Sequence, residues 1–288
     1  MNAVAILLAT ALAALPAIGI AAEPQTSDET AKGRIEQVSR HIGEMSMTMP
    51  TSPAGDAVTE RLRFEPWQAL EDLFRDDVVF LMRHGPTDWS KRDATDVAPD
   101  DCDNQRVMTP DGQRQMYEMG ALLVANDIVP GKIIVSRWCR NQQTFEALRE
   151  GMLATDAGAL DGVEIETVDD LNLLLALQGA PNVTNLREVV SEWDGEDASG
   201  PLLVITHYTN INELTEFSVY EGEMLMLDPT RENRVLGYLR LRSAGPDVGH
   251  FPEEVVNAST IPTDGRSSDE APGQDDAASA TEEPSPSE

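Results

Sequence analysis

Three short runs of large apolar and β-branched residues constrain the fold of this chain most strongly. They occupy residues 77–82, 132–136 and 202–206, and runs of this kind predict strands that are buried in a sheet. Helical patterns follow the first two runs, over residues 109–123 and 142–153. Because alternating strands and helices are typical of a parallel sheet covered by helices, the sequence predicts an α/β fold: three-layer α/β/α with a mostly parallel central sheet.

The remaining segments indicate how the chain is divided. Residues 23–75 are expected to form a linker and an N-terminal extension, with little regular structure up to about residue 60. Two late strands are expected over residues 223–227 and 235–241. In residues 244–288 Pro, Ser, Asp, Glu and Ala dominate, which predicts a disordered acidic tail because such a segment cannot bury enough apolar surface to become ordered.

Acidic residues dominate the charge of the chain. It holds 51 Asp and Glu against 21 Lys and Arg, a formal net charge of -30. Such a chain repels the phosphate backbone of nucleic acids and anionic lipid surfaces. We therefore expect no nucleic-acid partner, and a phosphorylated substrate would need a local cluster of positive side chains.

The first 22 residues carry no charged side chain and are mostly Ala, Leu, Ile and Val. With small residues at Gly19 and Ala21, they predict a cleaved signal peptide over residues 1–22, although the positive residues that usually begin such a signal are missing. An uncleaved membrane anchor is the alternative, which Pro16 and the weakly apolar alanines disfavour. The protein is therefore expected to be periplasmic or secreted, with no stable membrane insertion after cleavage.

The chain has two cysteines, Cys102 and Cys139. An oxidising compartment permits disulfides that the cytosol would reduce, so export favours one bridge between them. Two separate free thiols remain the alternative, because the sequence does not give the distance between Cα atoms that a disulfide requires.

Arginine and histidine residues follow all three predicted buried strands. Arg83 and His84 follow the first strand, Arg140 lies shortly after the second, and His207 follows the third. The carboxyl ends of parallel strands meet at one edge of a sheet, where open α/β sheets bind ligands. A neutral imidazole can attack phosphorus, and guanidinium groups hold phosphate oxygens. The pattern therefore predicts a phosphoryl-transfer site at this edge.

The motifs around these residues resemble those of a known family. Residues 81–89, Leu-Met-Arg-His-Gly-Pro-Thr-Asp-Trp, are similar to the opening signature of the histidine phosphatase superfamily, which has the phosphoglycerate-mutase-like fold. Ser136, Arg140 and Thr144 resemble its second arginine motif, and residues 204–207, Val-Ile-Thr-His, resemble its second histidine strand.

The resemblance covers roughly residues 76–242 and implies a histidine phosphatase domain over residues 76–243. It implies His84 as the nucleophile that forms a phosphohistidine. Around the transferred phosphoryl group it implies a set of cationic and polar contacts: Arg83, Arg140, His207 and Thr87. Arg137 is expected to face solvent instead.

The resemblance does not identify the general acid. One branch of the family often carries an aspartate directly after the second histidine, where this chain has Tyr208. The other branch places a glutamate at a position comparable to Asn172, and an amide cannot donate a proton as an acid does. The candidates that remain are carboxylates elsewhere in the domain: Asp88, Asp170, Glu213 and Glu223. A leaving group of low pKa would need no strong acid.

Two further stretches, residues 98–106 and 207–211, resemble a bacterial subgroup of exported or envelope histidine phosphatases. That resemblance places Cys102 and Cys139 near the active-site loops. If they are bridged, the disulfide would tether the loop after the first histidine to the segment that carries Arg140, which could preorganise both phosphate contacts.

The sequence thus predicts a phosphatase that hydrolyses a phosphomonoester through a phosphohistidine on His84. Its substrate would be a phosphorylated small molecule or an envelope component. The histidines lack the spacing of a zinc site, so we expect neither a metal nor another cofactor, and His41 and His250 are expected to be peripheral. The alternatives are a catalytically weak member of the fold that binds a phosphate ligand, and a phosphoglycerate-mutase-like phosphotransferase, which the signal peptide and the missing glutamate disfavour.

Overall fold

The computed structural model describes residues 37–41, 44–48, 60–196 and 198–259, with side-chain positions from Glu60 onward. The predicted signal peptide and residues 260–288 of the predicted tail lie outside the described residues. None of the helices within these ranges is both long and apolar enough to cross a membrane.

The described strands form one nine-stranded sheet. Their bounds are β1 Gln37–His41, β2 Glu44–Thr48, β3 Leu62–Pro66, β4 Val79–Arg83, β5 Lys132–Ser136, β6 Glu164–Val168, β7 Leu202–Thr206, β8 Met224–Asp228 and β9 Arg234–Leu241. The α-helices are α2 Pro110–Ala125, α3 Cys139–Thr155, α4 Thr184–Ser191, α5 Tyr208–Thr215 and α6 Glu253–Ser259, and the short 3-10 helices are η1 Leu70–Phe74, η2 Cys102–Asn104, η3 Asp169–Leu171 and η4 Pro229–Arg231.

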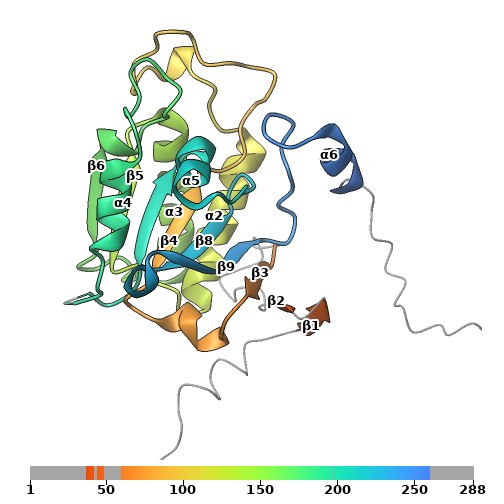
Figure 1. Ribbon diagram of the computed structural model, residues 1–288, viewed down its shortest axis with the longest axis vertical. Coiled ribbons are helices and arrows are strands. Elements are labelled where there is room, and N and C mark those ends of the chain that lie inside the picture. Colours follow the sequence, from red (N-terminus) through yellow and green to blue (C-terminus); the bar gives the residue numbers. More distant parts are fainter. Residues whose placement is uncertain (1–36, 42–43, 49–59, 197, 260–288) are drawn as a thin grey trace, which may run out of the picture.

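The sheet is mixed rather than mostly parallel. Its order is β1-β2-β3-β9-β8-β4-β7-β5-β6 (Figure 1). The strands β4, β7, β5 and β6 pair in parallel, whereas every pair from β4 through β8 to β1 is antiparallel. The prediction of a mostly parallel sheet is therefore wrong, because β8 and β9 are joined by a short connection that allows only an antiparallel hairpin.

The N-terminal extension contributes three of these strands. We expected little regular structure up to about residue 60, yet β1 (Gln37–His41) pairs with β2 (Glu44–Thr48). The strand β3 pairs with β9, with Leu62 opposite Leu241. Leu62 and Phe64 are fully buried, so the extension completes the core instead of lying loosely over it.

The strands that precede the predicted site residues, β4, β5 and β7, are the buried central strands of the sheet. Phe80 and Met82 of β4 join the apolar cluster that α2 and α3 cover. Val79 and Leu81, which alternate with them, join the cluster that contains residues of α4 and α5. Each central strand is therefore held from two sides, which favours a rigid position for the residue that follows it.

Close packing of α2 on α3 places the start of α3. A side chain at Gly120 would meet the carbonyl of Leu148, and one at Gly151 would meet the carbonyl of Tyr117. Because only glycine permits this approach of the two backbones, the helices can lie in direct contact. The N-terminus of α3, with Arg140 in its first turn, is thereby fixed beside the end of β5.

The segment after β9 departs from the predicted disordered tail. Residues 244–259 include α6, which stands apart from the sheet at the edge of the molecule (Figure 1). Asp247 is buried and forms an ion pair with Arg83, and Phe251 packs its ring edge-on against Tyr220. Composition alone favours disorder here, but these contacts with distant parts of the chain anchor the segment.

Candidate functional site

The carboxyl ends of three adjacent strands bring the predicted histidines and one predicted arginine together. His84 follows β4, His207 follows β7 at the N-cap of α5, and Arg140 lies in the first turn of α3 after β5. Both histidines are almost fully buried, with exposed fractions of 2% for His84 and 1% for His207. Their ring centroids lie 5.7 Å apart.

His84 is held with one ring nitrogen free to attack. Its backbone N–H donates to the Thr206 carbonyl at 3.0 Å, and its Nδ1 lies 2.9 Å from the Gly85 carbonyl oxygen. A carbonyl can only accept, so Nδ1 carries the hydrogen and Nε2 keeps its lone pair. The Gly85 N–H donates to Thr144 of α3 at 2.8 Å, which fixes the loop that carries this ring.

Burial keeps His84 neutral. Desolvation, with the positive charges of Arg140 and Arg83 added to it, holds the pKa of His84 well below its ordinary value. An imidazolium has no lone pair to offer, so this environment favours the nucleophilic form at neutral pH.

His207 is oriented through a chain of polar contacts. The Ser136 hydroxyl donates to the Asn172 side-chain carbonyl at 2.8 Å and lies 3.2 Å from His207 Nε2. Since that hydroxyl has given its proton to Asn172, it accepts from Nε2–H. His207 Nδ1 is buried without a partner, and burial, with the charge of Arg140, holds the pKa of His207 well below its ordinary value. Asn172 therefore positions the second histidine.

Two arginines face the same pocket. Arg140 is buried, and its Nη1 contacts both oxygens of Asp93, at 3.2 and 3.1 Å. Arg106 lies flat over the Trp89 ring, 3.5 Å from its centroid. The Nε atoms of both arginines are buried without a partner. Burial lowers the pKa of Arg140 to about 10, which leaves the guanidinium protonated at neutral pH.

A pocket of about 210 Å³ lies between these groups. Its lining combines a charged and imidazole wall with an aromatic and apolar one: His84, Arg92, Asp93, Arg106, Arg140, His207 and His250, together with Trp89, Leu173, Leu175, Tyr208 and Thr209. Of the predicted site residues, it contains His84, Arg140 and His207. His250, which the sequence led us to expect at the periphery, lines the pocket instead. Arg92, Asp93 and Arg106 also line it, and no motif in the sequence had indicated them.

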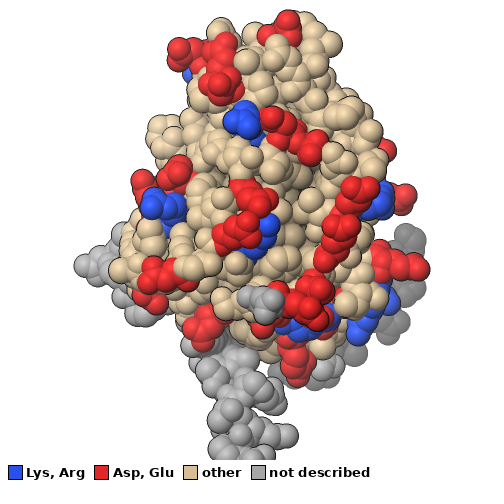
Figure 2. Space-filling model, turned by 90° about the vertical axis from the view of Figure 1, so that its left-hand side faces the viewer, with Lys and Arg blue, Asp and Glu red and all other residues tan. Residues whose placement is uncertain are grey.

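The pocket is lined by several positively charged side chains, although the molecule as a whole is acidic. Figure 2 shows the face beside β6 and α4, where carboxylate side chains outnumber Lys and Arg. Of the arginines that line the pocket, Arg140 is almost fully buried and Arg106 is half-buried, whereas Arg92 is exposed. Positive charge on buried side chains acts strongly at short range, so it can attract an anion despite the net charge of -30.

Arg83 and Thr87 lie beside the pocket rather than in its lining. Arg83 is fully buried, and its Nη1 donates to Asp247 at 2.5 Å and to the Val219 carbonyl at 2.8 Å. The Thr87 hydroxyl donates to Glu221 at 2.6 Å. Contacts of Arg83 and Thr87 with a phosphoryl group stay a prediction, and in this arrangement both side chains engage protein carboxylates.

Glu221 links these neighbours to the nucleophile, and the sequence analysis missed it. Its carboxylate also accepts from Trp89 Nε1 at 3.3 Å, lies 3.5 Å from Arg83 Nη2, and lies 4.0 Å from His84 Nδ1. It holds the loop after β4 from outside the pocket. Glu221 is one of three glutamates between α5 and β8 and belongs to no motif, so the sequence offers no signal for this contact.

None of the four carboxylates proposed as general acid lines the pocket. Asp88 is solvated and bonds Ser90, and Asp170 and Glu213 are exposed. Glu223 is buried, which raises its pKa, and pairs with Arg240 at 3.3 Å. Among the described residues no group of three or more His, Cys, Asp or Glu side chains could hold a metal ion.

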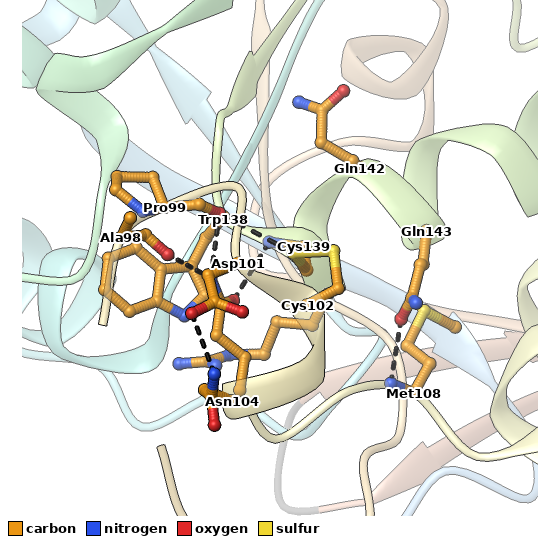
Figure 3. The surroundings of a disulfide bond; sticks show 12 residues. Ala98, Pro99, Asp101, Cys102, Asn104, Met108, Trp138, Cys139, Gln142 and Gln143 are labelled. Carbon is orange, nitrogen blue, oxygen red and sulfur yellow. Dashed lines mark hydrogen bonds between the residues drawn. A yellow bond between two sulfur atoms is a disulfide. The ribbon is translucent and has the colours of Figure 1, made fainter. Parts of the chain in front are cut away.

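Cys102 and Cys139 form a disulfide, as favoured from the sequence, and neither thiol is free. Their Cα atoms lie 5.5 Å apart. Figure 3 shows the bridge joining the loop at η2 to the first residue of α3, directly before Arg140. The same loop is bonded to α3 through Gln105, whose side chain accepts from the Cys139 N–H at 3.1 Å. The bridge thus fixes the loop that carries Arg106 against the helix that carries Arg140.

We expect the double substitution Cys102→Ser with Cys139→Ser to lower the free energy of unfolding by about 3–4 kcal/mol. The bridge closes a loop over a sequence separation of 37 residues, so its loss enlarges the unfolded ensemble. Urea unfolding in oxidising buffer measures the difference, and a reductant should remove it. Equal stabilities in oxidising buffer would contradict the expectation.

Among the comparisons with known proteins, only the one with solved structures finds proteins that this chain resembles. No family model matches the chain, and no curated protein matches it. It is similar to the protein histidine phosphatase SixA complexed with tungstate, with 19% identity and a TM-score of 0.39, over 57% of this chain and 96% of that one. It is also similar to phosphoserine phosphatase from Entamoeba histolytica in complex with 3-phosphoglyceric acid, with 12% identity and a TM-score of 0.38, over 59% of this chain and 98% of that one. Likeness at this level assigns no activity, and the chemistry of this site rests on its own geometry.

Proposed function

We propose that this protein is a histidine phosphatase that hydrolyses a phosphomonoester through a phosphohistidine on His84. One observation carries the proposal. Two buried N–H donors beside one pocket, Nε of Arg140 and Nε of Arg106, have no partner among the described residues, and neither has the buried Nδ1 of His207. Buried polar atoms are nearly always paired in native proteins, so a cluster of unpaired ones indicates an anionic ligand.

The nucleophile completes this arrangement. His84 faces the same pocket with Nε2 unprotonated, because Nδ1 donates to the Gly85 carbonyl. In the first step Nε2 forms a bond to phosphorus while the bond from phosphorus to the leaving oxygen breaks. The arginines neutralise the oxygens of the transferred group. Water then attacks the phosphohistidine and releases phosphate.

Asp93 and His207 change partners when the phosphate enters. Asp93 is paired with Arg140 in the absence of substrate, and a phosphate dianion, with more charge and more acceptor oxygens, competes for the same guanidinium. His207 can donate to phosphate only once Nδ1 is protonated, because its other nitrogen is committed to Ser136. Bound phosphate favours that protonated form by its negative charge.

Export and the class of substrate complete the proposal. The disulfide between Cys102 and Cys139 supports an oxidising location, periplasmic or secreted. The substrate we propose is a phosphorylated small molecule or an envelope component, which a pocket of about 210 Å³ would admit by its phosphate end.

The test is to trap the phosphoenzyme. The protein is mixed with a radiolabelled aryl phosphate and quenched in alkaline detergent, because a phosphohistidine is stable in base and lost in acid. We expect labelled protein, loss of the label on acidification, labelled inorganic phosphate as product, and mapping of the label to His84.

The alternatives give different results in the same experiment. Transfer of label to a second alcohol instead of water would indicate a phosphotransferase. Failure to detect either turnover or label, with inorganic phosphate still protecting the protein against thermal unfolding, would indicate a member of the fold that only binds phosphate. Label that persists in acid would contradict a histidine nucleophile.

A further inference from the structure

The loop after β9 returns to the pocket and contributes a histidine to it. His250 lines the pocket together with His84, and 24% of its side chain is exposed. Its ring stacks on Tyr208 at a centroid distance of 3.9 Å and meets the Trp89 ring edge-on at 5.4 Å. A mobile surface histidine would not be held between two aromatic side chains in this way.

A buried carboxylate fixes this ring. Asp247 Oδ1 lies 3.0 Å from His250 Nδ1 and accepts from the backbone N–H groups of Gly249 and His250, at 3.0 and 3.1 Å. Asp247 Oδ1, which can only accept, lies closer to Nδ1 than Arg83 Nη2, which can only donate, at 3.0 against 3.3 Å. We therefore assign the hydrogen to Nδ1, and Nε2 is the nitrogen available for proton exchange. Within the described part of the chain, Nε2 has no hydrogen-bond partner. Asp247 and His250 therefore form an acid–imidazole dyad at the mouth of the pocket.

Two side chains of opposite charge, Asp247 and Arg83, contact the ring of His250. Asp247 places a negative charge and Arg83 a positive charge beside Nδ1 of His250, because Arg83 Nη2 lies 3.3 Å from the atom that Asp247 contacts. Burial alone would raise the pKa of Asp247, but its bond with His250 and its contact with Arg83 hold that pKa well below the ordinary value, so the carboxylate stays ionised. The Tyr208 hydroxyl lies 2.8 Å from Ser218 and is engaged there, and Trp89 carries no charge.

We propose that His250, oriented by Asp247, is the general acid of the reaction; this inference rests on the proposed function. As His84 Nε2 bonds to phosphorus and the leaving oxygen departs, the proton on Nε2 of the His250 imidazolium passes to that oxygen and gives an alcohol. Neutral His250 then takes a proton from the water that attacks the phosphohistidine. Each turnover consumes one water, releases one alcohol and one phosphate, and restores both histidines.

The experiment compares leaving groups, because a general acid matters only where the departing oxygen is basic. Wild type and His250→Gln are assayed on phenyl phosphate and on dinitrophenyl phosphate, and kcat/KM is measured because it reports the steps up to release of the alcohol. We expect His250→Gln to lose about 10²–10³-fold on phenyl phosphate and less than about 3-fold on dinitrophenyl phosphate. Val248→Ala, on the same loop with 68% of its side chain exposed, is the matched control and should change neither value.

The outcomes separate the two proposals. Equal losses on both substrates, with the His84 label intact in wild type, would overturn the assignment of His250 alone. Absence of both turnover and label in wild type would overturn the proposed function and this assignment with it. An unfolding midpoint for His250→Gln equal to that of wild type checks that the variant is folded. If it is not, His250→Asn serves in its place, and the ratio of the two losses remains the criterion.

Discussion

Replacing His84 with Ala should lower kcat/KM for any phosphomonoester by a factor of about 10⁴ or more and abolish the labelled phosphoenzyme. The alanine has no atom that can form a bond to phosphorus. The cationic pocket would survive the change, because Arg140 and Arg106 are held by Asp93 and Trp89. The variant should therefore still bind inorganic phosphate, and this combination distinguishes the loss of a nucleophile from the loss of a fold.

His207→Ala is the matched comparison, because its ring is as deeply buried and lies 5.7 Å from that of His84. It would remove one donor to the phosphoryl group and should cost about 10²–10³-fold in kcat/KM, with the label still formed. Rapid quench at several times measures label in both variants. Label in His84→Ala, or its absence from His207→Ala over long incubation, would reverse the two assignments.

The sequence predicted correctly those parts of the fold and the pocket that depend on local runs of apolar residues and on the residues directly after them. The runs that became β4, β5 and β7 consist of side chains that are stable only when buried on both faces, so both their positions and the meeting of their carboxyl ends could be predicted. From that meeting followed the proximity of His84, His207 and Arg140. The start of α2 could also be predicted from neighbouring residues, because the Thr109 side chain caps the helix by accepting from the Gly112 N–H at 2.9 Å.

What the sequence could not show depends on contacts between distant residues. The position of β8 beside β4, which makes the sheet mixed, is a matter of strand order rather than of strand pattern. The β6 sequence, Glu-Ile-Glu-Thr-Val, is half exposed at the sheet edge and lacks the apolar run of the central strands. Composition assigned residues 244–259 to a disordered tail, yet Asp247 lies against Arg83 across a separation of 164 residues.

The same reason explains which contacts around the site the motifs did not reveal. Arg83 and Thr87 stand in a motif that predicts phosphate contacts, but Asp247 and Glu221, from segments without any motif, bind their side chains. Arg106 is held at the pocket by stacking on Trp89. Because the two residues lie 17 positions apart, this contact produces no periodic pattern in the sequence. Motifs thus located the pocket, while its walls come from loops whose conformation depends on the whole fold.

Arg140→Ala should lower kcat/KM by about 10³-fold or more, the second largest effect we expect at this site. The guanidinium is buried beside both histidines, and charge stabilisation in such a place is worth far more than on the surface. Arg140→Lys keeps the charge but loses the planar fork of donors, so it should recover only part of the activity. Arg137→Ala is the control, because Arg137 lies three residues away with 47% of its side chain exposed and pairs with Asp169.

A second comparison distinguishes two roles of Arg140, its charge next to the phosphoryl group and its contacts with the loop of residues 88–106. Arg140 also holds the loop of residues 88–106 through Asp93, so its loss could act by releasing Arg106 rather than by removing a phosphate ligand. Asp93→Asn weakens that link and leaves Arg140 in place. If charge is what matters, Asp93→Asn should cost far less than Arg140→Ala and should tighten inhibition by inorganic phosphate, because the phosphate no longer competes with a carboxylate for Arg140. Equal losses in the two variants would show that Arg140 acts by ordering the loop.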